Sequence, residues 1–193
     1  MDWSLFCSQC PGTDDASGLK TVCPACHSPW LVKYDRTATA AQLAALAPRG
    51  LSMWRYREFL PLVGKEEPVS IGEGGTPLIE APRLAARIGL SHLWIKDEAA
   101  NPTGSFKARG LSAAVTRATL AGASVFTLPT AGNAGVAAAA YGARAGATVR
   151  VYAPKSTPAP LLAQMAAYGA EVITLDGHIG DCGKASQIGR AHV

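Results

Sequence analysis

The chain has 193 residues, 48% of them hydrophobic and 17% charged, with a formal net charge of +4. This length predicts one full domain or two small ones, and the composition is that of a packed globular protein rather than a disordered one. Lysines and arginines are scattered, which argues against nucleic-acid binding. The N-terminal stretch MDWSLFCSQC lacks the pattern of a secretory signal, and no apolar run reaches the ~18 residues of a membrane span. We therefore expect a cytoplasmic protein that does not bind membranes.

A cluster of cysteines opens the chain. Cys7, Cys10, Cys23 and Cys26 form two C-x2-C pairs separated by twelve residues. Each pair aims two thiolates at one point, and four thiolates in a tetrahedral arrangement are what Zn²⁺ prefers. Two disulfides, which would need an oxidising compartment, and a redox dithiol pair are the alternatives. The spacing favours a zinc-ribbon-like module over residues 1–36, with a structural zinc ion whose coordination sphere the four cysteines fill.

Few regular elements are predicted between this module and residue 100. Residues 37–47 are predicted to form a helix, and residues 51–60 a helix or turn that ends at Pro61. The segment 69–82 contains three glycines but fits neither a dinucleotide-binding fingerprint nor a P-loop, so we interpret it as a turn. HLWIK at 92–96 predicts a short strand.

A lysine opens the next predicted helix. Lys107 follows a Thr-Gly-Ser turn in NPTGSFKARG, residues 101–110. Free backbone N–H groups and the positive end of the helix dipole at such a position favour an anionic ligand and a neutral amine. A lysine in this setting can form a Schiff base with an aldehyde cofactor, most often pyridoxal phosphate (PLP). The alternative is a solvated lysine on a helix surface.

From residue 105 onward, predicted helices and strands alternate. The expected helices are 105–121, 132–146 and 158–169, and the expected strands are 124–128, 148–152 and 171–175. Strands separated by helices of this length predict βαβ units in a parallel sheet, which binds ligands at the carboxyl ends of its strands. The segment 177–186 fits no phosphate loop and is interpreted as a loop and a helix start.

The loop after the first of these strands is the second candidate site. Residues 129–136, PTAGNAGV, are small and open a helix, so their backbone N–H groups can receive a carboxylate. Asn133 is the one long polar side chain in this loop, and it could hydrogen-bond a ring hydroxyl of a cofactor. A helix cap or a left-handed backbone position is the alternative role for Asn133.

Two motifs together point to a family. TGSFK around Lys107 and TAGNAG around Asn133 resemble fold-type-II PLP-dependent enzymes. The longer strings GEGGTPL, NPTGSFKARG and PTAGNAGVAAAAYGARAG, behind a four-cysteine ribbon, resemble threonine synthases more than threonine or serine dehydratases. Ala108 departs from the resemblance, because many threonine synthases have Asp after the lysine. The resemblance implies an α/β, three-layer parallel-sheet catalytic region over residues 37–193, similar to the tryptophan synthase β subunit.

The resemblance also implies roles for individual residues. Lys107 would bind PLP covalently and then move protons as a general base, and Asn133 would hold the 3′ oxygen of the cofactor. The loop that receives the substrate carboxylate would comprise Thr130, Ala131, Gly132, Asn133 and Ala134. The implied reaction converts O-phospho-L-homoserine and water to L-threonine and phosphate; deamination of threonine or serine is the alternative.

Family members are considerably longer than this chain. The glycine-rich loop that holds the PLP phosphate and the residue that faces the pyridine nitrogen lie in their second half, and neither is found here. We therefore expect an N-terminal fragment or split gene product with exposed apolar surface, inactive alone. Its candidate partners are an amino-acid substrate and either a second copy of the chain or a complementing C-terminal polypeptide. A non-catalytic zinc-ribbon half of a two-chain enzyme is the alternative from a different functional class.

Overall fold

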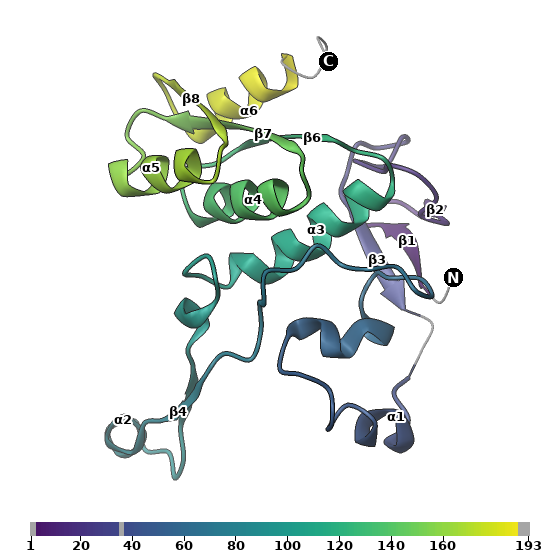
Figure 1. Ribbon diagram of the computed structural model, residues 1–193, viewed down its shortest axis with the longest axis vertical. Helices are drawn as coiled ribbons and strands as arrows, with labels where there is room; N and C mark the ends of the chain where they lie inside the picture. The colour runs from purple at the N-terminus through teal and green to yellow at the C-terminus, as the bar shows by residue number, and fades with distance from the viewer. Residues whose placement is uncertain (1–2, 35–36, 189–193) are drawn as a thin grey trace.

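The computed structural model describes residues 3–34 and 37–188, whose strands form three separate sheets (Figure 1). The strand orders are β2-β1-β3, β4-β5 and β6-β7-β8. Only the last sheet is parallel, and it forms the body on which both predicted PLP motifs lie.

The first sheet carries the cysteine cluster. It is antiparallel and consists of β1 (Trp3–Cys7), β2 (Thr13–Asp14) and β3 (Trp30–Tyr34). A small core of Trp3, Leu5 and Ala16 lies beneath it. The predicted module over residues 1–36 contains this sheet, although its first two and last two residues lie outside the described residues; the division at residue 36 stays a prediction.

Two short helices follow. α1 (Ala40–Ala44) is preceded by its N-cap residue Thr39, which forms a capping box with Gln42. This helix is shorter than the predicted 37–47 because none of its residues is buried, so no tertiary packing supports additional turns. The predicted helix or turn at 51–60 is a 3₁₀ helix, η1 (Met53–Phe59), with Met53 and Trp54 buried.

A hairpin that the sequence did not predict comes next. The glycines of the segment 69–82 do form turns, but interpreting the whole segment as a turn was wrong, because β4 (Leu78–Glu80) lies inside it. β4 pairs antiparallel with β5 (Trp94–Lys96), and α2 (Pro82–Arg87) lies between them in the chain. Figure 1 shows this unit projecting away from the other elements at the lower left.

The alternating region is a three-layer α/β body. Parallel β6 (Val125–Pro129), β7 (Thr148–Pro154) and β8 (Glu171–Leu175) lie between α4 and α5 on one side and α6 on the other (Figure 1). The bounds of the helices are α3 (Lys107–Leu120), α4 (Asn133–Arg144), α5 (Ala159–Ala167) and α6 (Ile179–Ile188). The predicted parallel sheet and every predicted helix and strand from residue 105 onward are therefore confirmed.

The core of this body lies between α4 and the sheet. Val136, Val149, Val151 and Met165 are buried there. Gly142 allows α4 to approach β7 closely, because a Cβ atom at this position would collide with the side chain of Val149. Close packing of α4 fixes the position of its N-terminus, where Asn133 lies.

Candidate active site and metal centre

Lys107 is the first residue of α3 and is half-buried. Its Nζ lies 4.7 Å from the ring centroid of Phe106, which is exposed. Within residues 3–34 and 37–188 the amine makes no ion pair. An amine at a helix start, without a carboxylate partner, is available to bind an added electrophile.

The loop before Lys107 is held by an ion-pair network. Arg109 donates to both carboxylate oxygens of Glu98, in η2 (Glu98–Ala100), over 2.7 Å each. Thr76 Oγ1 donates to the same carboxylate over 2.7 Å and Asn101 Nδ2 over 3.0 Å. These hydrogen bonds, the one from Arg109 first, lower the pKa of Glu98 to about 2. A charged, fully hydrogen-bonded Glu98 therefore fixes the start of the loop relative to the first turn of the helix that Lys107 opens.

Asn101 connects this loop to the GEGGT segment. Its Oδ1 accepts a hydrogen bond of 3.1 Å from the Gly74 N–H. Gly74 has a φ of +100°, and a Cβ atom there would collide with the backbone nitrogen of Met53. Glycine is thus required at position 74 both for its backbone angle and for the close approach of η1.

Glu73 anchors the same segment inside the protein. Its carboxylate is fully buried and accepts hydrogen bonds from Trp54 Nε1 (2.5 Å), Ser112 Oγ (2.7 Å) and Tyr141 Oη (2.7 Å). Burial alone would raise the pKa of Glu73, but the donated hydrogen bonds outweigh it and the pKa is lowered. Burial and the adjacent Glu73 carboxylate raise the pKa of Tyr141. Since Ser112 lies on α3 and Tyr141 on α4, Glu73 holds the two helices that carry Lys107 and Asn133.

The second predicted motif lies at the carboxyl end of β6. Thr130 is buried, donates its N–H to the Tyr152 carbonyl over 3.0 Å, and accepts from the Gly132 N–H over 3.2 Å. Asn133 is exposed and is the first residue of α4. Among the residues that the structure describes, no side chain caps this helix start. Its first N–H groups are therefore available to an anion, whereas carboxylate binding by the loop from Thr130 to Ala134 stays a prediction.

The structure brings the two motifs onto neighbouring helices. α3 and α4 pack together through Ala108, Val115, Ala137 and Tyr141. Within the described part of the chain, no hydrogen bond joins the side chains of Lys107 and Asn133. Their roles as cofactor-binding and catalytic residues stay predictions.

Two buried hydroxyl groups close to Lys107 in the chain lack partners. Thr103 Oγ1 and Ser105 Oγ are buried, and neither makes a hydrogen bond with any residue in 3–34 or 37–188. Buried polar groups without partners are rare in native proteins and often mark the place of a ligand. Together with the unpaired Lys107 amine and the uncapped start of α4, they fit an aldehyde cofactor that bears an anionic group. The sequence analysis did not identify either hydroxyl as part of a site, because Thr103 and Ser105 were interpreted only as turn residues.

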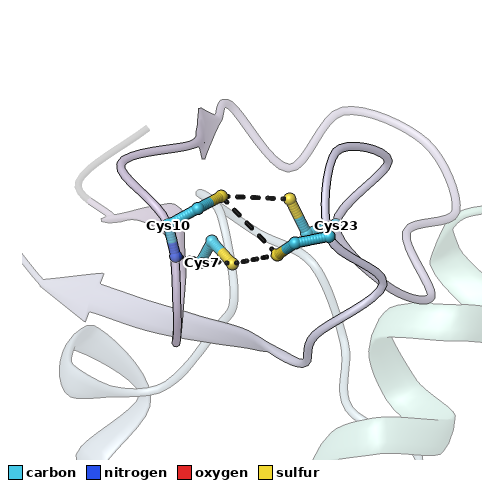
Figure 2. Close-up of side chains that lie close together, drawn as sticks. Cys7, Cys10 and Cys23 are labelled. Carbon is cyan, nitrogen blue, oxygen red and sulfur yellow. Dashed lines mark hydrogen bonds between the residues drawn. The ribbon is translucent and has the colours of Figure 1, made fainter.

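The four N-terminal cysteines form the candidate metal centre (Figure 2). Their sulfur atoms all lie within 4.8 Å of one another. The shortest separations are 3.3 Å from Cys7 to Cys26 and 3.6 Å from Cys10 to Cys23 and to Cys26. Four thiolates around one tetrahedral zinc ion would stand roughly 3.8 Å apart at a Zn–S distance of ~2.3 Å. The cluster therefore has the size of a metal site with four thiolate ligands.

With all four cysteines ionised, the cluster would be electrostatically unfavourable without a cation. A hydrogen bond from Ser28 lowers the pKa of Cys26 to about 6, so one thiolate forms readily. The Gly12 N–H lowers the pKa of Cys10, but the neighbouring sulfurs of Cys7, Cys26 and Cys23 outweigh it and raise the pKa to about 12. Four thiolates cannot share this volume unless a cation neutralises them, and the N–H groups of Gln9 and Cys10 already point at the Cys7 sulfur.

The fold and the motifs define the class of protein, and comparison with known families agrees. Residues 69–191, more than half of the chain, match the family model described as pyridoxal-phosphate dependent enzyme. The chain belongs to this family, and the predicted recognition is confirmed at this level.

Individual relatives show a more specific similarity within this family. The chain is 36% identical over 180 residues to threonine synthase of Methanosarcina acetivorans, covering 93% of this chain and 44% of that protein. It is 45% identical over 128 residues to threonine synthase of Mycobacterium leprae, covering 66% of this chain and 35% of that protein. The chain thus matches the N-terminal part of threonine synthases and spans less than half of their length.

Solved structures show the same fold. Diaminopropionate ammonia lyase from Escherichia coli, in complex with an aminoacrylate-PLP azomethine intermediate, superposes with a TM-score of 0.58 at 25% identity, over 64% of this chain and 36% of that one. A PLP-dependent aspartate racemase superposes with a TM-score of 0.55 at 29% identity, over 60% and 36% of the two chains. Across residues 3–34 and 37–188, none of the helices combines the length and apolar character needed to cross a bilayer.

Proposed function

We propose that this chain forms the lysine-bearing part of a PLP-dependent lyase of the threonine synthase type. The substrates would be O-phospho-L-homoserine and water, and the products L-threonine and phosphate. The observation that carries the proposal is the half-buried, unpaired Lys107 amine at the start of α3, preceded by two unpartnered hydroxyls and held by the Glu98–Arg109 network. The similarity to threonine synthases over most of the chain supports this choice of substrate.

Each residue of the site would have a separate role. Bound PLP would supply an electron sink for negative charge that develops on the substrate. Lys107 would hold the cofactor and would move a proton at the substrate α carbon through its Nζ. Asn133 would orient the cofactor by its amide, and the uncapped N–H groups at the start of α4, within the Thr130–Ala134 loop, would receive the substrate carboxylate.

Deamination of threonine or serine is the second candidate. Its support is the structural similarity to an ammonia lyase. The two functions would use the same lysine and the same carboxylate loop, so they differ only in the bond broken beyond the α carbon.

A second polypeptide would complete the enzyme. The hairpin of β4 and β5 is exposed along its whole length, including Leu78, Ile79, Trp94 and Ile95. Apolar strands that face solvent on both sides normally belong to a larger sheet that other elements cover. We propose that a polypeptide equivalent to the C-terminal part of threonine synthases covers this hairpin and supplies the groups that hold the PLP phosphate and pyridine nitrogen.

The assay follows from these proposals. The chain is mixed with the part of the M. acetivorans enzyme that lies beyond the match, and phosphate release from O-phosphohomoserine is compared with 2-oxo acid release from threonine. We expect phosphate release, abolished by Lys107→Ala and retained by Lys184→Ala, a change of an exposed lysine. Release of 2-oxo acid alone would favour the dehydratase instead.

The cysteine cluster would hold one structural zinc ion. Metal analysis of protein purified without chelator tests this directly. We expect about one zinc per chain, lost in Cys7→Ser and kept in Cys182→Ser, because Cys182 is buried in α6 away from the cluster. Wild-type protein with no bound metal would refute the zinc assignment without touching the PLP proposal.

A further inference from the structure

The sheet that carries the cysteines leaves a cavity where it meets α3. The cavity has a volume of about 400 Å³, which is within the range of small-molecule sites. Figure 1 shows β1 and β3 beside the later part of α3, and residues of all three elements line the cavity. Its walls therefore come from two parts of the chain that are far apart in the sequence.

Small side chains on the α3 side create this space. The lining residues there are Ala113, Ala114, Arg117, Ala118 and Ala121, the last of which follows directly after the helix. Except for Arg117 these side chains are single methyl groups, so the helix cannot fill the gap to the sheet. The other side of α3 differs, because Val115 and Thr116 are buried there.

The sheet contributes larger apolar side chains to the opposite wall. Leu5 of β1 pairs with Val32 of β3, and paired residues of an antiparallel sheet lie on the same face. Trp3 and Trp30 lie on this face as well, because each is two residues from one of them along its strand. All four side chains line the cavity. The two indoles make this wall suitable for contact with an aromatic ring.

Both tryptophans of this wall have an unsatisfied donor. The Nε1 atoms of Trp3 and Trp30 are buried, and neither has a hydrogen-bond acceptor among residues 3–34 and 37–188. Trp54, by contrast, donates its Nε1 N–H to Glu73 and Ser112. Indole N–H groups normally find an acceptor when they are buried. The two free donors therefore indicate that an acceptor group belongs at this cavity.

The charged residues that line the cavity are two cations. Arg117 pairs with Glu66 over 2.7 Å through Nη1, and its guanidinium lies 5.2 Å from the centroid of the Trp3 ring. Lys20 pairs with Asp14 over 3.1 Å, and neither acidic partner is a lining residue. Within the described part of the chain, no hydrogen bond uses Nε or Nη2 of Arg117. These N–H groups are therefore available to an anion in the cavity.

We propose that this cavity binds a small organic anion with an aromatic body, of the aryl carboxylate class. The ring would lie between the indoles and the alanines of the α3 wall, and the carboxylate would accept hydrogen bonds from Arg117 and from the indole N–H groups. α3 begins at Lys107, so the ligand would contact the same helix that presents the predicted PLP lysine. The inference goes beyond the proposed function and does not depend on PLP binding.

The indole N–H signals in the NMR spectrum of the full chain report this binding without any enzyme activity. Phenylacetate is added to isotope-labelled protein, and each indole signal is assigned by replacing one tryptophan with phenylalanine. We expect saturable shifts of the Trp3 and Trp30 signals and none of the Trp54 signal, since that N–H already has its acceptors. Phenethylamine, a cation of similar size, and acetate, which lacks the ring, should not shift them.

Two matched pairs of variants test the walls. Ala121→Leu fills the cavity and should abolish binding, whereas Ala143→Leu, on the exposed part of α4, should not alter it. Arg117→Gln removes the charge that meets the carboxylate and should weaken binding at least about tenfold. Arg87→Gln, at an exposed position of α2, is its control and should leave binding unchanged. The Trp54 signal of each variant shows whether the fold is retained.

Three results would overturn the inference. They are equal shifts caused by phenethylamine or acetate, unchanged binding in a folded Ala121→Leu variant, and absence of a saturable shift at Trp3 and Trp30. Covalent attachment of PLP to Lys107 is measured separately, so failure of this site and failure of the proposed chemistry are distinguishable.

Discussion

The parallel sheet and the β4–β5 hairpin have similar strands but opposite surroundings. In β7, Val149, Val151 and Ala153 are at most 3% exposed. In the hairpin, the paired Ile79 and Ile95 are 49% and 45% exposed, although their side chains are as apolar as those of β7. Hydrophobicity alone therefore does not decide burial in this chain; the presence of helices on both faces does.

This difference implies that the parallel sheet contributes to stability, whereas the hairpin contributes to assembly. The helices α4, α5 and α6 cover the parallel sheet, so its apolar side chains already contribute to folding. A two-stranded hairpin is marginal by itself, and its exposed apolar faces can contribute only when further protein structure covers them. Mutations in the two regions should accordingly affect different measurements.

The largest effect on stability is expected at Glu73, which joins the α3–α4 pair to the segment leading into the hairpin. Glu73→Leu would leave the buried donors of Trp54, Ser112 and Tyr141 without their acceptor. The free energy of unfolding, measured in urea, should fall by about 3–5 kcal/mol. Glu80→Leu, at an exposed position in β4, is the control and should change it by less than about 0.5 kcal/mol. Equal effects of the two variants would contradict the assigned role of Glu73.

Two substitutions that shorten an apolar side chain, one in each region, sharpen the comparison. Val151→Ala removes buried methyl groups from β7 and should lower the free energy of unfolding by about 2 kcal/mol. Ile79→Ala, in the exposed hairpin, should lower it by less than about 0.5 kcal/mol while weakening binding of the complementing polypeptide. A large loss of stability from Ile79→Ala in the chain alone would show that the hairpin is already packed.

The smallest effect concerns pH and the Glu98 network near Lys107. The folded pKa of Glu98 is about 2, below the ordinary value of 4.5, mainly because Arg109 donates to its carboxylate. The folded protein therefore binds this proton less readily than the unfolded one. The stabilisation by Glu98 is present above pH 4.5 and is lost as pH falls toward 2. Unfolding measured across this range should show a shallower pH dependence in Glu98→Gln than in the wild type.

Periodic patterns in the sequence predicted the body well. Each strand from β6 to β8 is a mostly apolar segment of five to seven residues between helices, and this is the signal that sequence analysis detects best. The short strand predicted at 92–96 is confirmed as β5, whereas β4 was missed because its three residues are too few to show a period and lie in a segment that its glycines marked as a turn.

The candidate site was predicted less completely than the fold. Lys107 and Asn133 stood out because their motifs combine turn residues with a helix start. Glu73 did not, because its partners Ser112 and Tyr141 are 39 and 68 residues away in the chain. The bidentate ion pair of Glu98 and Arg109 likewise depends on the conformation of the loop between them. The local sequence pattern does not specify this conformation.

Trapping of PLP on the chain tests the central claim most directly. The protein, alone and with the complementing polypeptide, is incubated with PLP, reduced with borohydride, digested and analysed by mass spectrometry. We predict that the pyridoxyl group is found on Lys107, and that Lys107→Ala abolishes this labelling whereas Lys184→Ala does not. Labelling of a different lysine in the completed enzyme, with activity retained in Lys107→Ala, would contradict the account.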